Sequence, residues 1–125
     1  MNKIAALVLG ILLSSTTTLW AEAETKTYPG PHEGAPNIYR QLFENDRVRI
    51  SEIMFKPGDK AAMHTHAYPH AVYVIEPGTL TLTHPDGTSA VVTAKAGDVL
   101  WLGPESHEAV NTGDTVLRAT VTEIK

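Results

Sequence analysis

Residues 63–76 read M-H-T-H-A-Y-P-H-A-V-Y-V-I-E and contain His64, His66 and His70, half of the histidines in the chain. A fourth, His107, follows much later in the sequence. Imidazole is the commonest protein ligand for transition metals, and it titrates near neutral pH. The stretch therefore predicts either a metal site or a site that handles protons.

The sequence around this stretch predicts short strands. After Pro36, runs of β-branched and aromatic residues are separated by turn signals such as P-D-G at 85–87. Strands of this length, about ten residues apart and without helical crossovers, predict an all-β sandwich or barrel. The expected strands cover residues 38–44, 47–56, 71–75, 79–83, 89–94, 99–102, 107–111 and 116–124.

The spacing of the histidines predicts that they meet. Side chains at positions i and i+2 of a strand point to the same face, so His64 and His66 project together if the segment is extended. Antiparallel packing can bring His107 opposite them. A buried cluster of imidazoles without a metal leaves ring nitrogens unsatisfied. The alternative is that the histidines are unrelated core or surface residues.

The first 23 residues have the parts of a secretory signal. A positive start precedes the apolar run Ile4–Leu13, which is too short to span a bilayer, and A-E-A at 21–23 fits a cleavage motif. Cleavage after Ala23 is predicted, with Ala21 as the alternative site. A buried N-terminal helix is the competing interpretation. The mature chain is therefore expected to be periplasmic or secreted, with no membrane contact once the signal is removed.

Composition excludes several classes of function. The net charge is −4 and the chain contains no cysteine. The mild acidity argues against nucleic acid as a partner, and the missing thiols exclude disulfides, thiolate chemistry and cysteine-based zinc sites. We expect a Pro/Gly-rich arm at 24–36, with His32 as an exposed loop residue, and a single domain at 37–125.

Two motifs resemble those of the cupin superfamily. The first cupin motif, G-x5-H-x-H-x3-4-E-x6-G, is similar to residues 58–78, but His70 stands at the usual glutamate position and the closing glycine is one residue late. The second, G-x5-P-x-G-x2-H-x3-N, is similar to residues 97–111, with G-P-E-S replacing its P-x-G. The resemblance implies a single-domain, cupin-type jelly-roll β-barrel.

The resemblance also implies a metal site. His64, His66 and His107 match the family's histidine ligands, and His70 is expected either as a fourth ligand, which we favour, or as a base beside a three-histidine site. An all-imidazole set suits one divalent Mn, Fe, Ni, Cu or Zn ion better than Mg or Ca.

The implied function is a metal-dependent oxidoreductase, dioxygenase-like, that acts on a small organic molecule, with lyase or isomerase chemistry as the second choice. A non-enzymatic module that binds a metal or small ligand is the alternative. Small single-domain cupins with similar motifs include one linked to β-alanine degradation. Tyr68 and Glu105 are the candidate catalytic residues, Trp101 is expected in the core, and His84 in a solvated turn. Family resemblance also suggests a homodimer.

Overall fold

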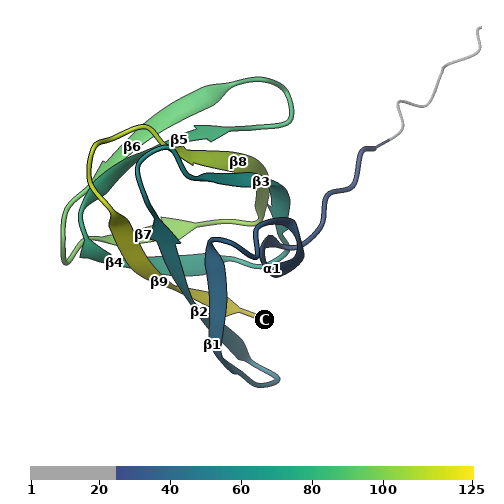
Figure 1. The fold of residues 1–125 in the computed structure, drawn as a ribbon. Coiled ribbons are helices and arrows are strands. Elements are labelled where there is room, and N and C mark those ends of the chain that lie inside the picture. The colour runs from purple at the N-terminus through teal and green to yellow at the C-terminus, as the bar shows by residue number, and fades with distance from the viewer. Residues whose placement is uncertain (1–24) are drawn as a thin grey trace, which may run out of the picture.

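The computed structural model describes residues 25–125, so the predicted signal peptide lies outside the described residues. Two antiparallel sheets form this part of the chain (Figure 1). The elements are α1 (Pro31–Gly34), β1 (Tyr39–Glu44), β2 (Val48–Phe55), β3 (Lys60–His66), β4 (His70–Glu76), β5 (Gly78–Thr83), β6 (Ser89–Ala94), β7 (Val99–Leu102), β8 (Glu105–Asn111) and β9 (Leu117–Ile124).

The sheets have the arrangement of a jelly roll. The larger has the strand order β1-β2-β9-β4-β7, and the smaller has the order β3-β8-β5-β6. Every strand pair is antiparallel. In Figure 1 the β1–β2 hairpin projects away from the smaller sheet. The all-β prediction is confirmed, and each expected strand has a counterpart. The strand β3, which carries two of the histidines, is additional.

The core lies between the sheets and follows the strand alternation. In β9, Leu117, Ala119, Val121 and Glu123 are buried, and the residues between them are more exposed. Phe55 is the largest fully buried hydrophobic side chain. Alternate residues of a strand point to opposite faces, so this pattern turns one face of the larger sheet toward the smaller one.

The segment before β1 is packed, contrary to the expectation of an irregular arm. Ala35 and Ile38 belong to the hydrophobic core. The backbone N–H of Thr65 in β3 donates to the carbonyl of Pro29 at 2.8 Å. His32 is only partly exposed and lies 2.7 Å from the Ser51 hydroxyl. The prediction of an exposed loop histidine is therefore wrong, because α1 docks against β3 and β1.

The expected core position of Trp101 is also wrong, since its side chain is 64% exposed. In β7, Leu100 and Leu102 are partly buried, whereas Val99 and Trp101 are largely exposed. Tyr73, the cross-strand partner of Val99, is exposed beside them. Within residues 25–125, no helix is long and apolar enough to cross a membrane.

Candidate metal centre

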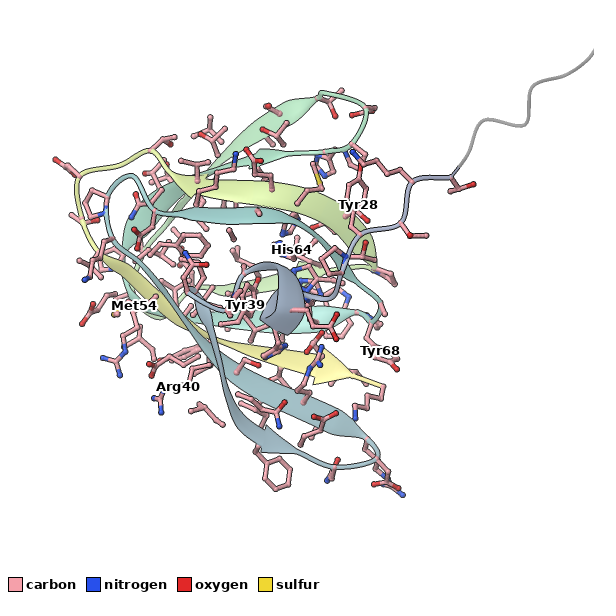
Figure 2. All side chains as sticks on the ribbon, turned by 45° about the vertical axis from the view of Figure 1, so that its right-hand side comes forward. Tyr28, Tyr39, Arg40, Met54, His64 and Tyr68 are labelled. Carbon is pink, nitrogen blue, oxygen red and sulfur yellow. The ribbon has the colours of Figure 1, made fainter. Side chains whose placement is uncertain are left out.

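Three histidines from two neighbouring strands converge inside the fold. His64 and His66 lie on β3, and His107 lies on β8 directly opposite His64. One ring nitrogen from each can be chosen so that all three lie within 4.8 Å of one another. All three side chains are buried. Figure 2 shows His64 beside α1 in the interior of the molecule.

A bulge in β3 aims the pair inward. The pairing of β3 with β8 shifts register between Ala61 and His64. Both residues are buried although they are three positions apart, which a regular strand does not allow. The extra residue restarts the alternation, so His64 and His66 both face the interior.

Hydrogen bonds fix the orientation of most of the predicted ligand rings through their Nδ1 atoms. In three of the four predicted ligands, Nδ1 lies within hydrogen-bond distance of an acceptor two residues earlier. The pairs are His64 with the Ala62 carbonyl at 2.7 Å, His70 with the Tyr68 carbonyl at 3.0 Å, and His107 with the Glu105 carboxylate at 3.0 Å. Because Nδ1–H donates in each pair, Nε2 keeps its lone pair, as in histidines that bind metals.

His66 differs from the others. Its Nε2 lies 3.1 Å from Nε2 of His64 and 3.4 Å from the Tyr39 hydroxyl. Its Nδ1 is buried and has no hydrogen-bond partner among the described residues. Two imidazoles bound to one ion at about 2.05 Å have nitrogens about 2.9 Å apart at a right angle and about 3.3 Å apart in a tetrahedron. The observed 3.1 Å therefore fits a shared metal ion.

The rings are held neutral. Burial, assisted by the neighbouring His70 and His107, lowers the pKa of His66 to about 2. Burial also lowers the pKa of His107 to about 4, with Glu105 opposing the shift. The pKa of His64 is lowered, again chiefly by burial. Neutral imidazoles keep a free lone pair at pH 7, which metal binding requires.

His70 lies beside this group of three. Its ring stacks on His66, with centroids 4.3 Å apart and an interplanar angle of 24°. It is 1% exposed and opens β4. It is not among the three residues whose nitrogens converge within 4.8 Å. Its role as a fourth ligand therefore stays a prediction.

Glu105 and His84 are linked to His107. The Glu105 carboxylate contacts Nδ1 of His107 at 3.0 Å through one oxygen and Nε2 of His84 at 3.3 Å through the other. Both side chains are partly buried. Glu105 therefore lies behind a predicted ligand rather than in an exposed loop, and His84 is not simply a solvated turn residue.

Tyr39, and not the predicted Tyr68, is the tyrosine whose side chain lies beside the histidines. The Tyr68 side chain is exposed and lies at the rim of the molecule in Figure 2, although its carbonyl orients His70. Tyr39 instead faces the centre, packing edge-on against His64 at 5.6 Å. Burial, assisted by Glu123, raises the pKa of the Tyr39 phenol, which stays protonated. Sequence reasoning missed Tyr39 because it precedes both motifs.

A cavity of about 340 Å³ adjoins the histidines. It lies between the two sheets, and its volume falls in the range of small-molecule sites. The lining residues are Tyr39, Ile53, Phe55, His66, His70, Val72, Val74, Leu80, Leu82, Val92, Ala94, Val99, Leu100, Trp101, Leu102, His107, Ala109, Leu117 and Val121.

Known proteins share this architecture. A cupin domain from Bordetella pertussis Tohama I is 27% identical, with a TM-score of 0.65, covering 80% of this chain and 98% of that one. A double-stranded β-helix protein from Klebsiella pneumoniae is 25% identical (TM-score 0.56; 78% and 83% covered). The polyketide cyclase RemF from Streptomyces resistomycificus is also 25% identical (TM-score 0.53; 69% and 63% covered).

The match extends to the sequence profile of a family. No curated protein matches the chain. The profile described as "Cupin domain" matches residues 51–123, which include all four predicted ligands and most of the strands. The chain therefore belongs to the cupin family.

Proposed function

We propose that the protein is an exported cupin that binds one divalent transition metal and acts as a metal-dependent oxidoreductase on a small organic molecule. In this proposal His64, His66 and His107 hold the metal, and His70 is the fourth ligand. The observation that carries the proposal is the convergence of three buried, neutral imidazoles beside a cavity large enough for a ligand.

The donor set supports a transition metal. Imidazole nitrogens suit Mn, Fe, Ni, Cu and Zn, whereas Mg and Ca prefer oxygen ligands. The three converging ligands are neutral, so the site would keep the full charge of a divalent ion and stabilise negative charge that develops on a bound oxygen. When bound, such a metal supplies Lewis-acid or oxygen-binding chemistry.

The protein's own residues would prepare the site. Glu105 holds the His107 ring through Nδ1, leaving Nε2 to point inward. The Tyr39 hydroxyl, 3.4 Å from Nε2 of His66, supplies a neutral hydrogen-bond donor at the cavity. The apolar walls around them exclude water, which strengthens electrostatic interactions at the polar end.

A non-enzymatic binding module is the second candidate. The observation that favours it is the burial of His70 in contact with His66. If His70 also binds the metal, four protein ligands leave fewer positions for substrate. Such a site would store a metal or hold a ligand without turning it over.

The first experiment measures metal content and affinity in the purified mature protein. About one equivalent of a transition metal is expected, with strong loss in His107→Ala. His32→Ala is the matched control, since His32 bonds Ser51 and lies outside the group of three. Absence of stoichiometric metal would overturn the proposal. Unchanged affinity in His70→Ala would remove His70 from the ligand set.

Two further measurements address activity and export. Oxygen consumption with the metal-loaded protein and a panel of diketones, thiols and amino acids separates an oxidoreductase from a binding module, because the module would be silent throughout. The intact mass of protein recovered from the periplasm or medium tests export. A chain starting at Glu24 is expected, and an uncleaved chain retained in the cytoplasm would contradict it.

A further inference from the structure

The walls of the cavity are almost entirely hydrocarbon. Apart from Tyr39 and three histidines, every lining residue is aliphatic, Phe or Trp. No Lys, Arg, Asp or Glu of the described segment lines it. The cavity can therefore accept apolar surface favourably, whereas an ionised group placed among these walls would lose its hydration without a partner.

The polar lining residues are gathered in one place. His66 is in contact with each of the others: its ring stacks on His70, its centroid lies 5.0 Å from that of His107, and its Nε2 lies 3.4 Å from the Tyr39 hydroxyl. A bound molecule would therefore find hydrogen-bonding groups at one end and hydrocarbon elsewhere.

The ion pair between Glu123 and Arg49 does not supply a charge to the ligand. Glu123 is 1% exposed and affects the pKa of Tyr39, so it lies close to the polar end. Its carboxylate is engaged by the Arg49 guanidinium in a two-pronged contact, with Nη2 to Oε1 at 2.9 Å. Because the two charges satisfy each other, neither is free to pair with an ionic ligand.

The size of the cavity limits the ligand. A cavity of roughly 150 Å³ is known to accommodate benzene. The volume here, about 340 Å³, is a little over twice that. A molecule with two fused rings, or an alkyl chain of similar bulk, would fill the space.

Two edge strands border the cavity. β6 and β7 are edge strands of different sheets and do not pair with each other. Both contribute to the walls, β6 through Val92 and Ala94 and β7 through Leu100 and Leu102.

We propose that the ligand is a compact, uncharged, hydrocarbon-rich molecule with a single hydroxyl or carbonyl oxygen. Its hydrocarbon body lies between the sheets, and its oxygen meets the Tyr39 hydroxyl and the histidines. The placement of the hydrocarbon part of the ligand is inferred from the cavity alone. Any role of the ligand oxygen in a reaction depends on the proposed function.

The test uses 2-naphthol and naphthalene-2-sulfonate as fluorescent probes of equal ring size. With metal-free protein, 2-naphthol is expected to bind at one site per chain, at least tenfold more tightly than the sulfonate. Equal or tighter binding of the sulfonate would overturn the proposal. Because this arm contains no metal, its result is independent of the metal-content measurement that tests the proposed function.

Two neighbouring residues of β6 provide matched variants. Val92 lines the cavity, whereas Val91 is 68% exposed. Val92→Trp is expected to weaken 2-naphthol binding at least tenfold, and Val91→Trp to leave it unchanged. If Val92→Trp does not fold in a thermal melt, the smaller Ala94→Val serves instead and is expected to weaken binding measurably. Unchanged binding in a folded cavity variant would place the ligand elsewhere and refute the proposal.

Discussion

Lowering the pH from 7 to 5 is expected to destabilise the metal-free protein by roughly 4 kcal/mol through two histidines alone. Burial lowers the folded-state pKa of His66 to about 2 and that of His107 to about 4. An unfolded histidine has a pKa of about 6.5. At pH 5 each unfolded imidazole lies about 1.5 pH units below its pKa, which corresponds to about 2 kcal/mol per residue.

The sign follows from proton binding. Both folded pKa values are depressed, so the unfolded chain binds more protons than the folded chain between about pH 6.5 and the folded values. The contribution to stability is complete above about pH 6.5 and declines as the pH falls. His32 and His64, whose pKa values are also lowered, act in the same direction. A loss of this size is a large share of a typical domain stability of about 5–15 kcal/mol.

Urea unfolding of the chelator-treated protein, followed by circular dichroism at pH 7, 6 and 5, measures the effect. The carboxylates of Glu44 and Glu52, whose pKa values are lowered by hydrogen bonds to Lys125 and Arg40, contribute only at lower pH, so this window isolates the histidines. His66→Asn is expected to remove about 2 kcal/mol of the change between pH 7 and pH 5. A free energy of unfolding that stays constant or rises toward pH 5 would refute the neutral, buried state of these rings.

Two substitutions test packing and ligand orientation. Gly78→Ala would place a Cβ 2.7 Å from Cβ of Leu117 and is expected to cost about 1–3 kcal/mol in urea unfolding, whereas Gly103→Ala meets nothing within 4 Å and should be nearly neutral; equal effects would contradict this packing. Glu105→Ala is expected to weaken metal affinity about 10–100-fold, with partial recovery in Glu105→Gln, because the His107 ring loses its anchor. Unchanged affinity in calorimetric titration would show that the carboxylate has no orienting role.

Sequence patterns predicted the strands, and the shared face of His64 and His66, well where residues alternated with a period of two. T-L-T-L-T became β5, and His64 and His66 share a face as i and i+2 spacing requires. The V-L-W-L run of β7 was ambiguous because all four residues are apolar, so the sequence alone did not show that Trp101 would be largely exposed.

Other features depend on contacts that no local pattern encodes. Tyr39 reaches His66 across 27 positions in the chain, and Pro31–Gly34 docks against β3 although its Pro/Gly content is typical of a loop. Glu105 is separated from His84 by 21 positions. Long-range packing placed these groups, so their relation to the site could not be seen from spacing within either motif.

The hydrogen bonds that orient the imidazole rings differ in whether a side-chain substitution can remove them. His64 and His70 are oriented by main-chain carbonyls, which persist whatever side chains occupy positions 62 and 68. His107 is oriented by a side chain, and that side chain is itself engaged by His84. Substitutions at Glu105 or His84 can therefore change the basicity of the His107 ring. The orientation of His64 and His70 is set by the backbone and would be unaffected by such substitutions.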